Sequence, residues 1–345
     1  MARIAQHQPP HGEYHGIVII GAGVSGLAAA QVLVENGIQP LVLDNAPTPG
    51  GRCTTITHAG GVFDLGAQFF AIRHPEFRDI AEGWLASGMV REWTCGFPEI
   101  SGVSELASHP RYCGAKGMRT LGAALAQNIQ LRQNTTVKRI SEGRACWLIE
   151  VKDSKRIKAD MVLLTPPTPA ALRLINDENT WRMGALLLPL TGVEYIPQIA
   201  VAAILAGPSG LPSPGAARVD SPEISWIADN QIKGISPVPA VTIHTNTKFA
   251  EAHIDTPLDE VGDLVAKVAA PMLKNRIVSI HTHCWRYGTP ANTLQKNFYL
   301  VEGRAPLYFA GDAFCGGLIE GATRSGIAVG KAIAERMKLA SKPTG

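Results

Sequence analysis

The sequence lacks the features that mark several large functional classes. No apolar run approaches the roughly 18 to 20 residues needed to span a bilayer, and no run of basic residues is present. The formal net charge is only +3, which is too small to indicate nucleic acid as the main partner. We therefore expect neither a membrane nor a nucleic acid among the partners.

Cysteine is sparse. The six cysteines match neither a metal motif nor a compact disulfide framework, at positions 53, 95, 113, 146, 284 and 315. Reduced thiols are typical of a cytoplasmic protein, so the predicted location is the cytoplasm. Residues 1–15 are rich in Gln, His and Pro and hold no apolar signal-peptide core. We expect this segment to be a flexible tail before the first strand.

The rest of the composition is that of a globular protein. Hydrophobic residues make up 46% of the 345 residues and charged residues 18%, which is usual for a chain with a sizeable core. A chain of this length favours two domains over one. We find no internal repeat, catalytic triad or carboxylate pair, so any chemistry must come from another kind of site.

Residues 16–44 carry the most informative motif, GIVIIGAGVSGLAAAQVLVENGIQPLVLD. An apolar run at 17–20 predicts a strand, and a helical stretch follows it. Between them Gly21, Gly23 and Gly26 form G-x-G-x-x-G. The first glycine allows a tight turn, the second lets a diphosphate approach the backbone, and the third lets the helix pack on the strand.

Asp44 completes this motif. It lies 18 residues after Gly26, at the end of a second apolar run, where its carboxylate can accept both hydroxyls of a ribose. The N-terminus of the intervening helix presents free N–H groups to the phosphates. Strand, helix, second strand and acid in this order predict a dinucleotide site, although the fingerprint alone does not separate FAD from NAD.

Two further segments favour FAD. Gly50, Gly51 and Arg52 follow the acid-bearing strand, and the arginine supplies a planar cation for phosphates or a flavin edge. Near the other end, PLYFAGDAFCGGLIEGATRSGIAVGKAIAERM at 306–337 runs from a strand through small residues into a helix. These segments resemble FAD enzymes of the amine-oxidase and protoporphyrinogen-oxidase kind, in which the second segment closes over the cofactor.

This resemblance implies roles for the second segment. Asp312 would bind the ribityl or pyrophosphate part of FAD. Backbone N–H groups from Glu320 to Ala322 would lie near the flavin pyrimidine, where they stabilise negative charge on the reduced ring. Cys315 is either the attachment point of a covalent flavin bond or, as we expect, a small residue in a tight loop, which leaves FAD bound non-covalently.

The middle of the chain resembles the renalase family. The similar blocks cover nearly the whole chain after residue 15 and include GVFDLGAQFFAIRHPEFRDIAEGWLASGMVREW at 61–93, RYCGAKGMRTLGAALA at 111–126, ISWIADNQIKG at 224–234, AVTIHTNTKFAEAHID at 240–255 and CWRYGTP at 284–290. The resemblance implies oxidation of the 2- and 6-dihydro isomers of NAD(P)H to NAD(P)+ by hydride transfer to flavin N5. Reoxidation by O2 would give hydrogen peroxide. The expected partners are therefore these dinucleotides and O2, for a monomer or homodimer.

We predict an α/β protein whose Rossmann-type FAD-binding domain belongs to a GR2-like, p-hydroxybenzoate hydroxylase-type two-domain architecture. The second domain is expected to be α+β and built on an antiparallel sheet, with strands at 198–206, 224–228, 240–245 and 276–287. The FAD-binding domain is expected to be discontinuous, over 16–75, 106–165 and 300–345. The substrate domain is expected to occupy 76–105 and 166–299.

One helix of the second domain has a clear start signal. We expect Thr256 to cap it, with Pro257 in its first turn and Asp259 completing a capping box. The apolar spacing predicts a buried stripe on this helix, made of Leu258, Val261, Leu264, Val265, Val268 and Met272.

The expected cofactor site draws on several parts of the chain. Residues 135–153 predict a β-hairpin, and the resemblance implies that the backbone of Val137 lies near the adenine. The full set of expected cofactor-binding residues is Gly21, Ala22, Gly23, Ser25, Gly26, Asp44, Asn45, Gly51, Arg52, Gln68, Val137, Gly311, Asp312, Glu320, Gly321 and Ala322.

Five side chains are candidates for the catalytic site, namely Gln68, His244, Trp285, Trp226 and Arg286. Gln68 is expected to reach the flavin edge, unless its amide is bound only to local backbone. His244 either faces the substrate or is a hydrogen-bonded structural histidine. Trp285 and Trp226 either stack on a flat pyridine ring or pack in the core.

Strand alternation places Arg286 on the face opposite Trp285. His281 and His283 share the face of Trp285 and form an H-x-H pair, but no third ligand stands at a recognisable spacing. We therefore expect no metal.

Two other functions remain open. The chain is alternatively an FAD-dependent amine oxidase or another oxidoreductase of that superfamily, or a flavin-binding protein without turnover. Hydride transfer to a flavin needs no strong acid or base from the protein, because the cofactor carries the electrons. The lack of a triad or a carboxylate pair is therefore consistent with the first interpretation.

Overall fold

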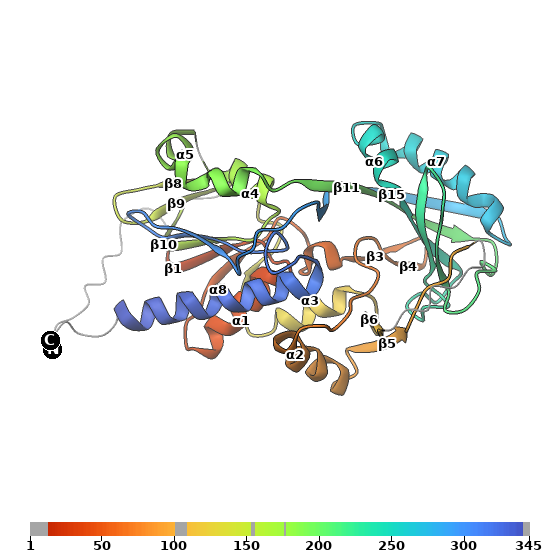
Figure 1. Cartoon of the computed structure of the whole chain (residues 1–345), viewed down its shortest axis with the longest axis horizontal. Helices are drawn as coiled ribbons and strands as arrows, with labels where there is room; N and C mark the ends of the chain where they lie inside the picture. The colour runs from red at the N-terminus through yellow and green to blue at the C-terminus, as the bar shows by residue number, and fades with distance from the viewer. Residues whose placement is uncertain (1–12, 101–108, 153–155, 176, 341–345) are drawn as a thin grey trace.

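The computed structural model describes residues 13–100, 109–152, 156–175 and 177–340. The molecule is elongated and has two parts, each with its own main sheet (Figure 1). The first is an eight-stranded sheet flanked by helices, and the second is a five-stranded sheet with helices on one side. Two long strands, β11 and β15, belong to the second sheet and run towards the first part.

The large sheet has the strand order β16-β17-β10-β1-β2-β7, with the hairpin β8–β9 attached through β9 to β10. Strands β17, β10, β1, β2 and β7 run parallel to one another, whereas β16 and β9 pair antiparallel with β17 and β10. The central strands are apolar runs where both faces of the sheet are covered, at 17–20 in β1, 41–43 in β2 and 161–164 in β10. The bounds are β1 Glu13–Ile20, β2 Leu41–Leu43, β7 Gln130–Arg132, β8 Val137–Glu142, β9 Trp147–Val151, β10 Ile157–Leu164, β16 Tyr299–Val301 and β17 Leu307–Phe309.

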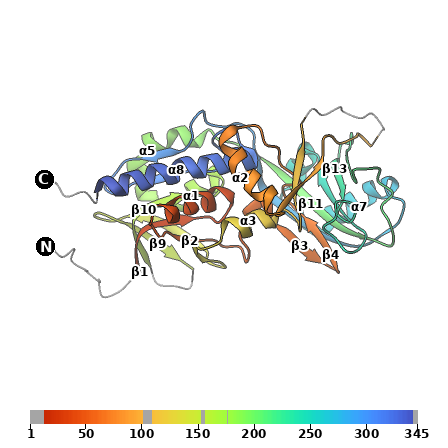
Figure 2. The same ribbon diagram turned by 90° about the horizontal axis from the view of Figure 1, so that it is seen from below.

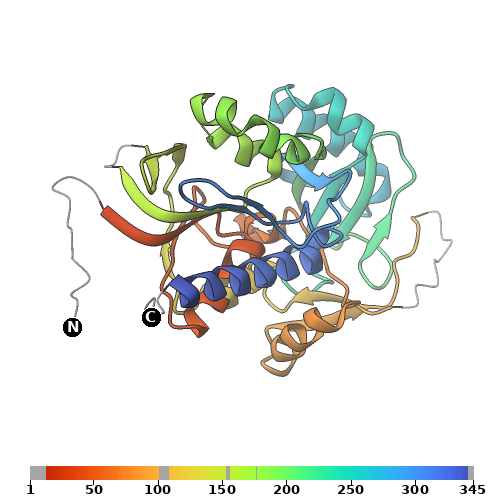
Figure 3. The ribbon, with the colours of Figure 1, turned by 60° about the vertical axis from the view of Figure 1, so that its left-hand side comes forward.

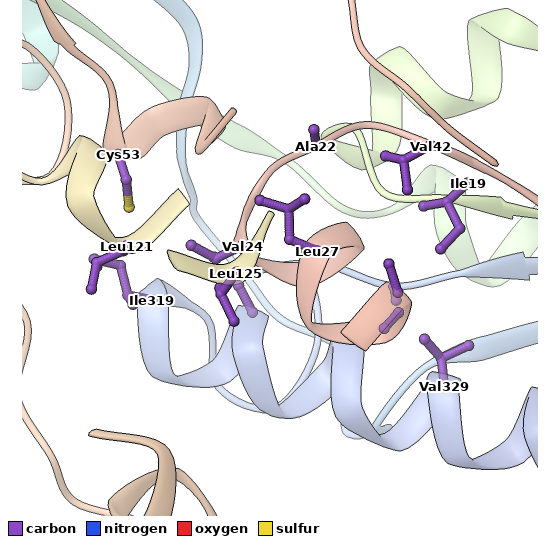
Figure 4. Close-up of a cluster of buried hydrophobic side chains, with 14 of the residues drawn as sticks. Ile19, Ala22, Val24, Leu27, Val42, Cys53, Leu121, Leu125, Ile319 and Val329 are labelled. Carbon is purple, nitrogen blue, oxygen red and sulfur yellow. The ribbon is translucent and has the colours of Figure 1, made fainter. Parts of the chain in front are cut away.

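Alternate side chains of β1 enter two separate cores. Ile17 and Ile19 pack with α1 (Val24–Glu35), α3 (Arg119–Leu125) and α8 (Leu318–Ala340). Val18 and Ile20 pack on the side of α4 (Thr168–Leu174) and α5 (Asp177–Thr191). Figure 3 shows α8 crossing one face of the sheet, and Figure 4 shows the side chains that join α1, α3 and α8 beneath the glycine turn.

The second sheet has the order β12-β13-β14-β11-β15 and is antiparallel. Ile199, Val201 and Ala203 of β11 pack on the side of α6 and α7. The alternate residues Ala200 and Ala202 face Phe63 and Leu65 of the first part. The bounds are β11 Tyr195–Leu205, β12 Ala216–Arg218, β13 Ile224–Asp229, β14 Ala240–Thr245, β15 Ile277–Pro290, α6 Thr247–His253 and α7 Leu258–Ala269.

Smaller elements fill the junction between the two parts (Figure 2). Helix α2 packs through Phe77 and Trp84 into the same core as α1 and α8. The bounds are α2 Pro75–Ala86, β3 Thr55–His58, β4 Gly61–Asp64, β5 Val90–Thr94, β6 Arg111–Gly114, and the short 3₁₀ turns Gly51–Cys53 and Ala270–Met272. In the described parts of the chain no helix has both the length and the apolar character needed to cross a membrane.

The structure confirms the predicted α/β fold with a Rossmann-type domain and an antiparallel second sheet, and it corrects two details. Residues 13–15 are part of β1 rather than of a tail, because they pair with β10 from Glu13 onwards. The rest of the predicted tail, 1–12, lies outside the described residues.

The second correction concerns α7, whose N-cap is Pro257 without a side-chain cap. The predicted Thr256 cap is therefore absent. Leu258 and Leu264 of the predicted stripe are exposed, because only one narrow side of α7 meets the sheet through Val261 and Val265.

Candidate functional site

In the glycine turn between β1 and α1, one glycine packs tightly against the backbone and another faces open space. Gly21 has φ +107°, and its N–H donates to Leu43 O at 2.8 Å. A Cβ on Gly26 would lie 2.0 Å from Gly21 O, so only glycine allows this packing. At Gly23, in contrast, a Cβ would meet no atom within 4 Å. The space in front of Gly23 is therefore free for a ligand.

The start of α1 is suited to an anion. Gly23 is the N-cap, no side chain caps the helix, and no acidic residue lies in its first turn. The first N–H groups of the helix are thus available to phosphate oxygens. The hydroxyl of Ser25 is buried and has no hydrogen-bond partner among the described residues.

Asp44 lies beside the same turn. Its Oδ2 accepts from Ala22 N–H at 2.5 Å and its Oδ1 from Ala46 N–H at 2.7 Å. These bonds hold the carboxylate at the end of β2 next to the glycine turn, where it was predicted to meet a ribose. Asn45 follows on the exposed side. Val137 begins β8 and is half-buried.

Arg52 joins the glycine pair after β2 to a segment far along the chain. Its Nη1 lies 2.6 Å from Asp312 Oδ2 and also donates to the carbonyls of Tyr287 and Gly288. Asp312 Oδ1 accepts from the Tyr195 hydroxyl at 2.8 Å. Burial, with the neighbouring Asp312 carboxylate, raises the pKa of Tyr195, so this phenol remains a hydrogen-bond donor.

The first turn of α8 lies next to these residues. Gly311 has φ +144° and donates to Ser325 Oγ at 3.1 Å. Glu320 uses its Oε1 to accept from the N–H groups of Arg73 and His74, so its side chain is occupied by that loop. Gly321 and Ala322 are buried. The Gly321 N–H already donates to Gly317 O at 2.8 Å, so the predicted backbone donation to the flavin is left to the N–H groups that precede it in the first turn of α8.

Cys315 lies just before α8 in a left-handed conformation, with φ +53°. Its thiol donates to Asn297 Oδ1 at 3.4 Å. Burial raises the pKa of Cys315, which keeps the sulfur protonated and poorly nucleophilic.

Gln68 is buried at the end of the turn that leaves β4. Its Nε2 donates to Asp64 O at 2.5 Å and to Gly66 O at 3.2 Å. Both partners are carbonyl oxygens, which only accept hydrogen bonds. The amide atom that faces them must therefore be the nitrogen Nε2. Its Oε1 is buried and accepts no hydrogen bond from any described residue. Local backbone therefore satisfies only the donor half of this amide.

His244 and Trp285 meet the same turn from the second sheet. His244 Nε2 lies 3.0 Å from Leu65 O, which requires the proton on Nε2, and Trp285 Nε1 donates to Leu65 O at 3.2 Å. Gln68 Nε2 is 3.4 Å from His244 Nε2, but both atoms are donors in this arrangement. Burial lowers the pKa of His244 to about 4, so the ring is neutral near pH 7.

Trp226 is the cross-strand partner of His244 on β13 and β14, and its buried indole N–H has no hydrogen-bond partner among the described residues. Trp226 packs with Trp93, Phe69 and Phe97 in an aromatic group. Arg286 is exposed and forms an ion pair with Asp255 at 2.5 Å, on the face of β15 opposite Trp285. Arg286 is therefore outside the candidate site, a correction to the predicted catalytic set that its alternation along the strand already suggested. The described residues contain no group of three His, Cys, Asp or Glu side chains placed to hold a metal.

Sequence reasoning missed two charged residues at the centre of the junction. Lys233 and Asp64 are both fully buried, and Lys233 Nζ lies 2.7 Å from Asp64 Oδ2. Both stand inside blocks quoted above for their family resemblance, DLGAQ and DNQIKG. No local spacing links them, since they are 169 residues apart.

Together these features fit a dinucleotide cofactor. The open space at Gly23, the uncapped start of α1 and the adjacent Asp44 suit a diphosphate and a ribose. The unpartnered Gln68 Oε1 marks an acceptor at the junction of the two sheets. The fold and the site thus define the class of two-domain dinucleotide-binding proteins.

Comparison with known protein families identifies the family within this class. Residues 19–84 match the NAD(P)-binding Rossmann-like domain, and residues 85–334 match the flavin containing amine oxidoreductase family. The second match spans most of the chain, so the protein belongs to the flavin-containing amine oxidoreductase family. FAD is the cofactor of this class, which confirms the predicted FAD, and the predicted flavin-dependent oxidoreductase is confirmed at the level of the family.

Relatives and solved structures are consistent with this assignment. A neurosporene-forming phytoene desaturase of Rhodobacter capsulatus is 51% identical over 55 residues, which are 16% of this chain and 10% of the relative. A flavin-containing amine oxidase of Danio rerio is 43% identical over 56 residues, covering 16% of this chain and 11% of the relative. These matches thus span about a tenth of each relative's own length.

The structural similarity extends over almost the whole chain. A protein from Exiguobacterium sp. 255-15 described as a protoporphyrinogen oxidase has a TM-score of 0.70 at 13% identity, covering 94% of this chain and 99% of that one. A variant of putrescine oxidase has a TM-score of 0.66 at 13% identity, covering 94% and 100%. At such identity the similarity shows the fold alone.

Proposed function

We propose that the protein is a renalase-like FAD-dependent oxidase, which oxidises the 2- and 6-dihydro isomers of NAD(P)H to NAD(P)+. FAD, when bound, would supply the redox chemistry: it takes a hydride at N5 and passes two electrons to O2, so that substrate, O2 and a proton give NAD(P)+ and hydrogen peroxide. Membership of the family supports the flavin chemistry, whereas the identity of the substrate is what we propose.

One observation carries this proposal, namely that the polar groups at the junction are held in neutral or paired form. His244 is a neutral donor to Leu65 O. Lys233 is paired with Asp64, and Gln68 is an amide. Among the described residues of this junction, the lowered pKa makes His244 a weak base and Asp64 is paired with Lys233. Hydride transfer from a dihydropyridine needs no strong general base.

The residues of the chain would then bind and orient. Trp285 is half-buried next to the Gln68 turn and offers a flat face to a pyridine ring. Gln68 Oε1 would accept an N–H of the flavin or of a carboxamide. Arg52 would hold the cofactor near its phosphates or flavin edge from its place beside Asp312. These contacts would place the two rings for transfer and exclude water.

Several finer assignments belong to the same proposal. The sheet β12-β13-β14-β11-β15 beside the Rossmann-type sheet supports a p-hydroxybenzoate hydroxylase-type arrangement of the two parts. The protonated Cys315 thiol supports non-covalent FAD. A cytoplasmic monomer or homodimer, with the dinucleotide and O2 as its partners, completes the proposal.

A direct test uses borohydride-treated NAD+, which contains the stray isomers. The oxidised protein is mixed with this material and the flavin absorbance is followed. Rapid bleaching followed by recovery in air, with equimolar hydrogen peroxide, is the expected result. Pure 4-dihydro NADH is the matched control and should bleach the flavin far more slowly.

The second candidate is an amine oxidase, which the putrescine oxidase fold favours. Bleaching by a primary amine or polyamine, with no response to the NAD isomers, would establish it. A flavin that is reduced by neither class of compound would instead indicate a flavin-binding protein without turnover.

A further inference from the structure

Lys233 is a fully buried cation in the loop after β13. Its Nζ donates to Asp64 Oδ2 at 2.7 Å and to Gln68 O at 2.7 Å. The ammonium also lies 4.6 Å from the centre of the Trp93 ring, a favourable cation–π distance. One side chain from the loop between β13 and β14 thus contacts both ends of the turn that carries Gln68.

Asp64 is the other half of this junction. Its Oδ1 accepts from the Thr55 hydroxyl at 2.5 Å and from Met118 N–H at 2.8 Å. The carboxylate therefore ties together β3, β4 and the start of α3, while its Oδ2 binds Lys233. Breaking a buried pair on one side leaves a charge without a partner, whereas replacing both members is often tolerated.

The turn held by this pair determines where the Gln68 amide points. Gln68 Nε2 donates to Asp64 O and Gly66 O, and the Gln68 carbonyl is fixed by Lys233. Both the backbone and the side chain of Gln68 are thus anchored, and Oε1 is left buried without a partner among the described residues. A buried acceptor of this kind takes a donor from outside the described residues, such as a bound ligand or water.

We propose that the buried Lys233–Asp64 ion pair is a positioning element, which holds the Asp64–Gln68 turn in register with the second sheet and directs Gln68 Oε1 at the bound flavin. Lys233 and Asp64 act through Gln68 and need not touch the substrate. The inference rests on the proposed placement of FAD beside this turn, but it is independent of which substrate is oxidised.

Hydrogen bonds within the loop that carries Lys233 fix the conformation of its backbone. Asp229 Oδ1 accepts from the N–H groups of Gln231 and Ile232, at 2.7 and 2.9 Å. Asp229 Oδ2 accepts from the Ser209 hydroxyl at 2.5 Å, and Lys233 N–H donates to Asp229 O at 2.9 Å. A short, bonded loop reduces the freedom of the lysine, as positioning requires.

The test compares Lys233→Met, Asp64→Asn and the double variant with Gln68→Leu. Exposed Lys248 gives the matched control Lys248→Met. Each full-length protein is assayed for melting temperature, FAD affinity by fluorescence titration, and the absorption spectrum of bound flavin. Where substrate turnover is measurable, kcat and KM are determined separately.

We expect each single variant to lose melting temperature and the double variant to regain most of that loss, because no buried charge is then unpaired. The double variant should still lack the contact to Gln68 O. Its flavin spectrum should therefore shift in the same direction as in Gln68→Leu, or its FAD affinity fall. Its kcat should fall by roughly tenfold or more with a smaller change in KM. Lys248→Met should match the wild type.

Two results would overturn the proposal. A double variant with wild-type melting, FAD affinity and flavin spectrum shows that the pair only stabilises the fold. A double variant no more stable than Lys233→Met shows that the pair does not couple the two sheets. The flavin spectrum and the FAD affinity are measured without substrate. They therefore test this inference even if the dihydronicotinamide isomers do not reduce the flavin and the proposed function is wrong.

Discussion

Arg52 Nη1 lies 2.6 Å from Asp312 Oδ2, and this bond joins the two segments that are proposed to hold the nucleotide. The two residues are 260 positions apart, on segments that follow β2 and β17. The same guanidinium binds the carbonyls of Tyr287 and Gly288 on β15. One side chain therefore connects the first βαβ unit, the last parallel strand and the second sheet at the place where the cofactor is proposed to lie.

Replacing Arg52 with Met should weaken FAD binding by about ten- to a hundredfold, because hydrogen bonds to charged groups contribute about 1.5–3 kcal/mol each. The melting temperature should also fall, since Asp312 keeps only its bond from Tyr195. Fluorescence titration of the apoprotein with FAD measures the first effect. Arg286→Met is the matched control, because Arg286 also pairs with a carboxylate but on the outer face. Equal losses in both variants would argue against a role of Arg52 in the cofactor site.

Two glycines of the same motif should respond oppositely to alanine. At Gly23 a Cβ meets no atom within 4 Å, so Gly23→Ala should change the free energy of unfolding by less than about 0.5 kcal/mol. Its methyl group should nevertheless obstruct the diphosphate and reduce FAD affinity by about tenfold or more. Gly26→Ala places a Cβ 2.0 Å from Gly21 O and should cost about 3 kcal/mol of stability. Urea unfolding and FAD titration separate the two effects, and unchanged FAD affinity in Gly23→Ala would contradict the placement of the phosphates.

Gln68→Leu should alter the flavin spectrum and reduce turnover, because the acceptor at Oε1 is lost. The structure adds a stability effect, since Asp64 O and Gly66 O lose their donor. We expect a loss of about 1–3 kcal/mol from these unpaired carbonyls. Absorption spectroscopy, steady-state kinetics and urea unfolding measure the three quantities. A flavin spectrum identical to that of the wild type would show that Gln68 does not face the ring.

His244 should make the protein acid-sensitive. Burial lowers its pKa to about 4, while an unfolded histidine has a pKa of about 6.5. The unfolded chain thus binds a proton that the folded one excludes, so stability is complete above pH 6.5 and falls as the pH decreases towards 4. From pH 7 to pH 5 the loss should be about 2 kcal/mol. Urea unfolding of the wild type and of His244→Gln at both pH values measures this term, which the variant should lack; the same acid-sensitivity in both would exclude His244 as its source.

FAD should be released from the protein by acid precipitation. The Cys315 thiol is protonated at neutral pH and donates to Asn297, which disfavours attack on a flavin. We expect the yellow colour to remain in the supernatant in both the wild type and Cys315→Ala. Colour retained in the wild-type pellet but not in the variant pellet would instead show a covalent bond at this residue.

Local spacing was enough to predict the βαβ unit that carries the glycine turn. Gly21, Gly23 and Gly26, the helix behind them and Asp44 at the end of β2 form one continuous βαβ unit, so their contacts follow from chain order. The strands expected in the second sheet correspond to β11, β13, β14 and β15, with some ends displaced by a few residues. The α7 cap was wrong because Thr256 was judged from local sequence, whereas its conformation depends on how the chain leaves α6.

The tertiary structure alone decided the polar contacts between distant segments. Arg52 and Asp312, like Asp64 and Lys233, are brought together by strands that return from opposite ends of the chain. No periodicity encodes such a pair, because its energy depends on burial and distance in three dimensions. Burial likewise made His244 neutral and left Gln68 Oε1 without a partner. The sequence by itself determined the glycine turn at which we predict the dinucleotide, and the packing of the two sheets determined which polar groups meet at the junction beyond it.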